Sequence, residues 1–385
     1  MKKLKVEDFA TVITGGTPST RVPEYWENGD VPWLTSGDLN QGMIESASKC
    51  ITQNGLKNSS ARLMPPNTVA IALTGATTGV VGYLKTEACG NQSVTGILPS
   101  EHHDSKYLYY FLNSIREKVQ YDSYGGAQPH ISQKYVKEIL VPLPPLAEQK
   151  RIADLLDKAD VLRKKNKELL AAYDELLKAT FLDMFGDPVS NPKDLKRGVI
   201  GDLVSSVNYG TSSKAEEDGQ YPYLRMNNIT YSGEMDFSDL KYINISSKDI
   251  EKYTVKRGDL LFNRTNSKEL VGKTAVFRKS EPMVIAGYII RVRPNEKANS
   301  EYLSGFLNSA YGKSILKGLC KSIVGMANIN AKELQKIRIL VPPINEQKRF
   351  AQIVENIEAQ KALVKQCLQE SEDLFNGLVQ KAFKD

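Results

Sequence analysis

The sequence predicts an α+β chain made of two similar domains, each followed by one long helix. The first observation is an uninterrupted helical pattern over residues 144–186, with two prolines at its start and Gly-Asp-Pro at its end. The second is a repeat of the segment that leads into this helix. Ile-Leu-Val-Pro followed by Glu-Gln-Lys-Arg occupies residues 139–151 and recurs at residues 339–349. The repeat indicates one domain-and-helix unit that is used twice.

The repeat divides the chain into four parts. We expect a first domain at residues 1–143, a helix at 144–186, a second domain at 187–342 and a C-terminal helix at 343–385. A helix of roughly 40 residues is about 60 Å long, so each helix is long enough to separate two domains. If the first helix leads to the far domain and the second returns from it, the two helices run antiparallel and form a pseudo-twofold arrangement.

The two domains share one order of short segments. In both we expect short strands separated by Gly, Pro and Asn turns, then a helix at Phe-Leu-Asn-Ser and a glycine-containing loop. The matching segments are Val12–Ser19 with Ser206–Ser213, Val31–Leu39 with Tyr221–Ile229, Met64–Leu73 with Val255–Arg264, and Tyr107–Ser114 with Tyr302–Ser309. The predicted strands are Val69–Leu73, Val80–Leu84, Leu260–Phe262, Lys273–Phe277 and Val284–Val292.

Apolar residues of both long helices recur with the spacing of three or four that is typical of a seam between helices. We therefore expect the helices to pack as a coiled-coil spacer. The expected seam residues are Ile152, Leu155, Ala159, Leu162, Leu169, Tyr173 and Leu176 in the first helix and Ile353, Ile357, Val364 and Leu374 in the second. Asn166 is the polar member of the stripe, and it either fixes the register at the seam or lies beside it in water.

Composition is that of a soluble globular chain, for which we expect a cytoplasmic location. Of its 385 residues, 41% are apolar and 25% are charged, and no apolar run is long enough to span a bilayer. The basic N-terminus is not followed by an apolar core of signal-peptide length. The four cysteines are not paired in CxxC motifs, so we expect free thiols in a reducing compartment.

The net charge of +6 is concentrated in one part of the chain. Residues 187–342 contain 24 basic and 17 acidic residues, whereas residues 1–146 contain 13 of each. A local basic surplus favours a polyanionic partner, because phosphate contacts supply much of non-specific DNA affinity. A solvated basic face without a partner explains the same surplus.

The sequence offers no catalytic or metal-binding constellation. The three histidines are His102, His103 and His130, and no second cluster of metal-ligating residues accompanies them. Gly272-Lys273-Thr274 resembles the end of a phosphate loop, but Ser267 stands where that loop requires glycine. The chain also lacks the Asn/Asp-Pro-Pro-Tyr/Phe tetrapeptide that adenine methyltransferases use. We therefore expect a protein without catalysis of its own.

Several motifs taken together resemble one known family. They are the duplicated Val-Pro…Glu-Gln-Lys-Arg segment, FLDMFGDPVSNP at Phe181–Pro192, the opening GGTPS with VPWLTSGDL, and NRTNSKELVGKTAVF at Asn263–Phe277. In this order they look like the specificity subunit of type I restriction–modification systems. The resemblance covers essentially the whole chain.

The resemblance implies two target-recognition domains, each reading one half of a bipartite site on double-stranded DNA, and two antiparallel helices that set the gap. It also implies partners. Two modification subunits would dock on the helices and methylate adenine, and two restriction subunits would translocate and cleave DNA. S-adenosylmethionine, ATP and Mg²⁺ would be bound by those partners, and this chain itself would bind no cofactor or metal and contact no membrane.

Candidate DNA contacts lie on polar loops, because such side chains can reach base edges or phosphates. In the first domain the candidates are Arg21, Thr74, Thr77, Thr78, Gln92 and Gln128; in the second they are Arg225, Arg264, Asn266 and Lys268. The first domain has no arginine where the second has Asn-Arg-Thr-Asn, which is expected if the halves read different bases.

Two other functions are compatible with parts of the pattern. A scaffold that binds proteins through its helical hairpin and binds no DNA would explain the long helices, and it would lack a basic face on both domains. A self-contained enzyme would explain the two domains, but the missing motifs argue against it.

Overall fold

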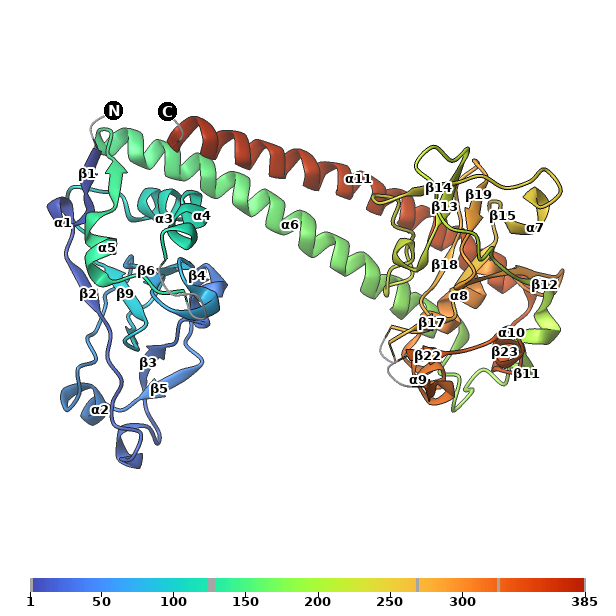
Figure 1. The fold of residues 1–385 in the computed structure, drawn as a ribbon. Coiled ribbons are helices and arrows are strands. Elements are labelled where there is room, and N and C mark those ends of the chain that lie inside the picture. The colour runs from blue at the N-terminus through green and yellow to red at the C-terminus, as the bar shows by residue number, and fades with distance from the viewer. Residues whose placement is uncertain (1–2, 124–128, 268–269, 324–325, 384–385) are drawn as a thin grey trace. The chain divides into compact units, whose positions relative to one another are not determined.

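The structure is a computed structural model that describes residues 3–123, 129–267, 270–323 and 326–383. The chain divides into two compact units. The first unit contains Met1–Asn166 and Cys367–Asp385, and the second contains Lys167–Gln366. Each unit therefore combines one α+β domain with part of both long helices (Figure 1). The units divide the helices internally, so the four expected sequence parts stay a prediction.

The two long helices are α6 (Leu146–Phe185) and α11 (Ile344–Phe383), each of 40 residues (Figure 1). Both begin within one residue of a Pro-Pro pair, which suits the first helical turn because proline lacks an N–H there. α6 ends at Phe185, and the next residue, Gly186, has a φ of +74°, which residues with a Cβ atom rarely adopt. The sequence pattern therefore located both helices to within two or three residues.

The glutamine of the repeated Glu-Gln-Lys-Arg motif fastens each long helix to its domain. In the first unit Gln149 is 1% exposed; its side-chain oxygen accepts the N–H of Asp104 at 2.9 Å, and its amide donates to the Pro144 carbonyl at 2.9 Å. Asp104 is also the N-cap of α3 (Ser105–Ser114). One buried side chain thus satisfies backbone groups on two helix ends that water cannot reach.

The second unit repeats this arrangement. Gln347 is fully buried, accepts the N–H of Asn299 at 2.9 Å and donates to the Pro342 carbonyl at 2.9 Å. Asn299 is the N-cap of α8 (Ser300–Asn308). The motif is repeated in the sequence because the same joint between a long helix and a domain is built twice.

In the first unit a five-stranded sheet has the order β2-β9-β6-β7-β4, with β4 parallel to β7 and the other pairs antiparallel. A second sheet has the order β5-β3-β8, and β1 pairs with β10. The strands are β1 (Lys3–Lys5), β2 (Val12–Thr14), β3 (Val31–Leu34), β4 (Met43–Ile44), β5 (Lys49–Ile51), β6 (Val69–Ala72), β7 (Val81–Leu84), β8 (Cys89–Gly90), β9 (Val94–Ile97) and β10 (Leu140–Pro142). The short helices are α1 (Val6–Phe9), α2 (Gln53–Lys57), α4 (Arg116–Tyr121), α5 (Gln133–Glu138), η1 (Pro23–Tyr25), η2 (Asp38–Gln41) and η3 (Gly75–Thr77).

In the second unit the main sheet has the order β12-β20-β16-β18, and a second sheet has the order β14-β13-β19-β15. Smaller sheets are β17-β22-β21 and β11-β23. The strands are β11 (Lys196–Val199), β12 (Val204–Tyr209), β13 (Tyr221–Leu224), β14 (Lys241–Ile243), β15 (Thr254–Val255), β16 (Leu260–Asn263), β17 (Thr265–Asn266), β18 (Thr274–Val276), β19 (Met283–Ile285), β20 (Ile289–Pro294), β21 (Lys321–Ile323), β22 (Met326–Asn328) and β23 (Arg338–Val341). The short helices are α7 (Ile250–Tyr253), α9 (Ala310–Leu319), α10 (Ala331–Gln335), η4 (Ile200–Leu203) and η5 (Met226–Asn228).

The predicted strand Val284–Val292 is two strands in the structure. A turn separates β19 from β20, closed by the Ile289 N–H donating to the Ala286 carbonyl at 2.8 Å. The β-branched residues on both sides of Gly287 hid this turn in the sequence pattern. The turn places β19 and β20 in different sheets.

The strand registers also correct the match between the two domains at their first segments. Val12 pairs with Ile97, and Val207 pairs with Val292 in the equivalent strands of the second unit. Val12 therefore corresponds to Val207, whereas the sequence match had placed it opposite Ser206. The Gly-Thr identity favoured a match that is one residue out of register.

In each unit α6 and α11 pack with opposite chain directions. In the first unit the Arg163 guanidinium lies 4.0 Å from the centroid of the Phe375 ring, and Asn166 lies 3.5 Å from the Ser371 hydroxyl. Asn166 thus lies at the seam, as one of the two expected placements had it. In the second unit Asp174 lies 2.6 Å from Lys361 and the Phe181 ring centroid lies 5.6 Å from that of Phe350, so the chain directions are again opposite.

The inward residues of both helices are spaced by three or four, and all are buried or half-buried. On α6 they are Ile152, Leu156, Ala159, Arg163, Asn166, Leu170, Tyr173, Leu177, Phe181 and Met184. On α11 they are Phe350, Val354, Ile357, Lys361, Val364, Leu368, Ser371, Phe375, Leu378 and Ala382. Ile353, expected at the seam, is half-buried beside them.

Five of the expected seam residues lie on the outer side of the helices instead. The exposed fractions of Leu155, Leu162, Leu169 and Leu176 are 38%, 47%, 42% and 48%, and that of Leu374 is 51%. The inward position is one residue later in every case. The seam is displaced because some inward positions are polar, so the leucines form the more regular apolar stripe.

Candidate nucleic-acid interface

Arg264 lies at the end of β16 on a framework of backbone hydrogen bonds. Its N–H donates to the Tyr288 carbonyl at 2.9 Å, and its carbonyl accepts the N–H of Ile329 at 2.9 Å. The guanidinium lies 4.8 Å from the centroid of the Tyr209 ring and 3.3 Å from the Asn328 side-chain oxygen. Tyr209 and Tyr288 are 39% and 54% exposed. A half-buried arginine held flat by an aromatic ring can present its outer N–H groups to a base or a phosphate.

The same framework position in the first unit is Leu73. Its N–H donates to the Ser93 carbonyl at 2.8 Å, and its carbonyl accepts the N–H of Ile131 at 2.9 Å. Leu73 is buried at 4% exposure and offers no polar group. Two copies of one backbone framework therefore present different side chains at one position.

Polar candidates of the first unit lie next to this position. The Thr74 hydroxyl donates to the Ser93 hydroxyl at 2.8 Å, and the Thr77 hydroxyl donates to the Thr74 carbonyl at 3.1 Å. Gln92 is exposed and accepts a hydrogen bond from the Thr17 hydroxyl. The ends of β6 and β9 thus bring three of the candidates together.

The remaining candidates of the first unit differ from these. Thr78 is 1% exposed, and its hydroxyl lies 2.8 Å from the Gly75 carbonyl and 2.9 Å from the Pro129 carbonyl. It stabilises the turn and is not an exposed contact residue, which the loop sequence could not reveal. Arg21 is exposed just before η1. Gln128 and, in the second domain, Lys268 lie outside the described residues.

Arg225 precedes η5 and is already engaged. Its guanidinium forms an ion pair with Asp239 at 2.7 Å, and its N–H donates to the side-chain oxygen of Asn228 at 2.8 Å. Its Nε atom is buried and has no hydrogen-bond partner within the described ranges. DNA contact by Arg225 would therefore require exchange of the Asp239 partner. Asn266 is half-buried, and its side-chain oxygen accepts the N–H of Ser267 at 2.8 Å.

Two lysines beside η5 were not predicted as site residues. Lys273 is buried and donates to the Met226 carbonyl at 2.7 Å, and burial lowers its pKa. The Lys313 ammonium lies 4.6 Å from the Tyr231 ring centroid. Burial and the positive charge of Lys273 lower the pKa of Lys313 to about 8. The sequence analysis noted Lys273 only as part of Gly272-Lys273-Thr274, which resembles the end of a phosphate loop but lacks the glycine that such a loop requires.

The comparison with known families decides the identity of the chain. The family described as "Type I restriction modification DNA specificity domain" matches residues 1–171 and again residues 192–372. The chain belongs to this family. The two matches agree with the two units of the structure.

Individual specificity subunits are similar over most of the chain. The specificity subunit of the type I restriction enzyme EcoKI from Escherichia coli strain K12 is 25% identical over 408 residues, which cover 98% of this chain and 87% of that protein. The MjaIX specificity subunit of Methanocaldococcus jannaschii is 28% identical over 285 residues, covering 68% of this chain and 65% of that protein. The crystal structure of the type I S subunit from M. genitalium has a TM-score of 0.62 at 17% identity, covering 100% of this chain and 96% of that chain, and so shares the fold.

This specificity-domain protein is the non-catalytic, DNA-specificity subunit of a type I restriction–modification system. Within the described ranges, no group of three or more His, Cys, Asp or Glu residues could hold a metal ion. No helix in the described part of the chain is both long and apolar enough to cross a membrane. Cys50, Cys89 and Cys367 are free thiols.

Proposed function

We propose that each unit of this specificity subunit reads one half of a bipartite DNA site. The observation that carries this proposal is the shared framework position that is Arg264 in one unit and Leu73 in the other. Arginine can make a bidentate contact to guanine in the major groove, whereas leucine cannot. Two readers with one backbone and different side chains suit a site whose halves differ in sequence.

The helix pair α6 and α11 would be an antiparallel coiled-coil spacer that sets the gap between the half-sites. Its inward residues have the spacing of a coiled coil, and within each unit the chains run in opposite directions. A stiff spacer converts two weak half-site affinities into a strong one only when its length matches the gap.

The outer leucines of α6 would form part of the surface on which modification subunits dock. Four leucines with exposed fractions of 38–48% recur every seven residues, which leaves an apolar stripe on a helix that is otherwise charged. Such stripes commonly mark protein–protein contacts. Two modification and two restriction subunits would complete the complex, and S-adenosylmethionine, ATP and Mg²⁺ would belong to those subunits.

Methylation mapping tests the proposal directly. The chain is expressed with its modification subunit in a host that lacks other adenine methylation, and methylated sites are mapped by single-molecule sequencing. We expect one bipartite motif with adenine methylated in both halves, lost when this chain is deleted. An assembled complex that methylates no such motif would contradict the proposal and favour a protein scaffold.

Arg264→Ala tests the reading position within that motif. We expect a loss of about 1–3 kcal/mol in binding free energy, roughly 5- to 150-fold in affinity, together with relaxed preference at one base of one half-site. The matched control is Arg338→Ala, an exposed arginine on β23, which pairs with β11 outside the sheet that carries Arg264. Equal effects of the two substitutions on affinity and preference would remove Arg264 from the interface.

A further inference from the structure

Within the second unit, α11 carries a row of charged side chains that contact the α+β domain. Glu355 forms an ion pair with Arg257 at 2.9 Å, and Glu358 lies 3.8 Å from Arg278. Lys361 follows Glu358 on the same face of the helix, because residues three or four apart are neighbours on a helix surface. The domain therefore meets this part of α11 through ion pairs as well as through apolar packing.

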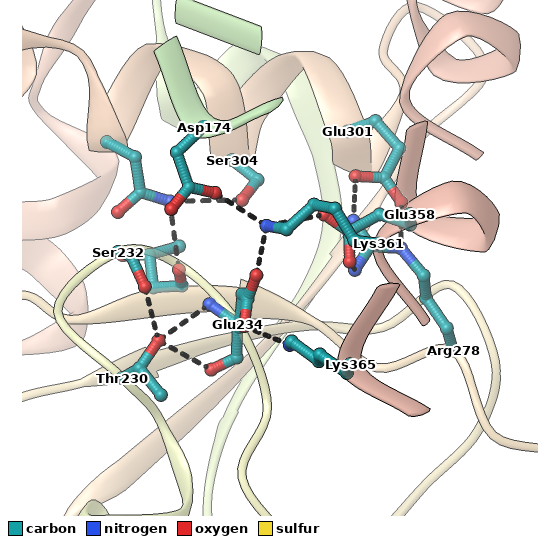
Figure 2. Close-up of polar contacts among 12 residues, drawn as sticks. Asp174, Thr230, Ser232, Glu234, Arg278, Glu301, Ser304, Glu358, Lys361 and Lys365 are labelled. Carbon is teal, nitrogen blue, oxygen red and sulfur yellow. Dashed lines mark hydrogen bonds and ion pairs between the residues drawn. The ribbon is translucent and has the colours of Figure 1, made fainter. Parts of the chain in front are cut away.

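Lys361 is the centre of this row. Its side chain is 3% exposed, and its ammonium lies 2.6 Å from Asp174 of α6 and 3.4 Å from Glu358 of α11. It also forms an ion pair with Glu234, which belongs to the loop between η5 and β14 (Figure 2). One ammonium group thus joins both long helices to a loop of the recognition domain.

The pKa values of Lys361 and Glu234 both shift in the direction that favours their charged forms. Burial opposes the charged form of Lys361, but hydrogen bonds to Asp174 and Glu234 outweigh it and raise the pKa of Lys361. Burial likewise opposes ionisation of Glu234, and hydrogen bonds from Lys361 and Lys365 lower its pKa overall. Lys365 lies 2.6 Å from the second carboxylate oxygen of Glu234. Both carboxylate oxygens of Glu234 are therefore held by α11.

Hydrogen bonds within the turn hold the loop that presents Glu234. The Thr230 N–H donates to the Glu234 carbonyl at 2.9 Å, and the Glu234 N–H donates to the Thr230 hydroxyl at 2.9 Å (Figure 2). Between them Gly233 has a φ of +95°, and a Cβ atom there would lie 2.5 Å from the Asn308 amide nitrogen of α8. These contacts hold Glu234 at a defined position on the turn, facing α11.

The same loop holds the candidate reading residue Arg225 at its other end. The Asn228 amide donates to the carbonyls of Asp236 at 2.9 Å and Asp239 at 3.1 Å, and Asp239 is the ion-pair partner of Arg225. These bonds hold Arg225 separately from the Thr230–Glu234 turn, so the contacts to Lys361 and those at the candidate interface lie at opposite ends of one loop.

The first unit has no such link at the matching helix position. Phe185 and Phe383 occupy matching positions near the ends of α6 and α11, so Arg163 of α6 corresponds to Lys361 of α11. Arg163 forms an ion pair with Asp160 of its own helix at 2.6 Å and stacks on Phe375. Its contacts within the described part of the chain are with helix residues.

We propose that Lys361 is a positioning residue that clamps the Thr230–Glu234 turn onto α6 and α11, so that the second recognition domain keeps the orientation on the helix pair that its half-site requires. This inference rests on the proposed function of the two units. The clamp acts on the tolerated gap between half-sites and leaves the contacts within one half-site intact. It makes a residue far from the candidate interface a determinant of gap specificity.

The test uses the complex of this chain with its modification subunit. Three kinds of DNA duplex are compared, all based on the motif that methylation mapping identifies. The first contains the motif with its natural gap, the second contains it with the gap changed by one base pair in either direction, and the third contains only the half-site read by the second unit. The variants are Lys361→Met and the charge-balanced pair Lys361→Met with Glu234→Gln. Arg163→Met is the matched control, because it removes the cation at the corresponding position of the other helix. Hydrogen exchange of residues 229–239 is measured without DNA.

We expect the ratio of the affinity for the natural gap to the affinity for the altered gaps to fall at least about tenfold in both Lys361 variants. Correct spacing of two linked sites is worth about 10²- to 10⁴-fold in affinity, so a loss of this size is measurable. Half-site affinity should stay unchanged, and exchange in residues 229–239 should rise. Arg163→Met should keep the wild-type gap preference.

Three results would overturn the inference, each in a different way. Unchanged gap preference in the charge-balanced variant would show that the clamp positions nothing. Equal losses for the half-site and the bipartite site would indicate a general structural role. A wild-type complex without any gap preference would contradict the proposed function itself, and the inference would fall with it.

Discussion

Replacing Gln149 by methionine tests the joint between α6 and the first domain. The substitution keeps the side-chain length but removes the acceptor for the Asp104 N–H and the donor to the Pro144 carbonyl, both at 2.9 Å. Gln149 is 1% exposed, so water cannot replace either partner. An unsatisfied buried backbone group costs about 1–3 kcal/mol, and two such groups predict a loss of about 2–6 kcal/mol in the free energy of unfolding.

The assay is urea denaturation followed by tryptophan emission. The two tryptophans of the chain, Trp26 and Trp33, both belong to the first unit and pack edge to face with ring centroids 5.0 Å apart. Their emission therefore reports on unfolding of the unit that contains Gln149. The midpoint should fall without a change in slope, because the surface exposed on unfolding stays the same.

Gln380→Met is the control. Gln380 lies on the exposed side of α11 within the first unit, so the same substitution should change the unfolding free energy by less than about 0.5 kcal/mol. A loss below about 1 kcal/mol for Gln149→Met, or equal losses for the two variants, would refute the assigned role of the glutamine.

Two further predictions concern packing and pH. Burial lowers the pKa of His103 to about 4, so as pH falls this histidine binds a proton in the unfolded state before it does in the folded state. The free energy of unfolding of the first unit should therefore fall by about 2 kcal/mol between pH 7 and pH 5. The His103→Gln variant should not show that fall in the same urea assay. A Cβ atom on Gly305 would lie 2.7 Å from the Phe181 ring, so Gly305→Ala should destabilise the second unit by about 1–3 kcal/mol in far-UV dichroism melts. Gly318 has open space at its Cβ position, so Gly318→Ala should stabilise it by up to about 1 kcal/mol; the opposite order would contradict the packing.

The elements that the sequence predicted well depend on local signals. Uninterrupted helical residues bounded by Pro-Pro pairs located α6 and α11, and the repeated motif revealed that the same joint is built twice. Loop polarity placed Arg264 at the end of a strand, where the structure has it exposed enough to contact a partner. These features need only neighbours in the sequence.

The features that escaped prediction depend on distant partners. Five seam residues were predicted one position too early, because a long polar side chain such as Arg163 can occupy an inward position and bury its stem while its end finds a partner. Lys361 is buried only because carboxylates from residues 174, 234 and 358 surround it. Apolar counting cannot detect a buried lysine whose partners come from three separate segments.

Two polar contacts within the helix pair also fix the register of one helix against the other. Asn166 meets Ser371 in one unit, and Lys361 meets Asp174 in the other. Sliding one helix past the other would place these groups against apolar neighbours, which buried polar groups do not tolerate without large cost. An insertion in one helix between these two contacts must therefore be accompanied by an insertion of equal length in the other helix. If the pair sets the gap between half-sites, as proposed, only changes made in both helices together alter that gap.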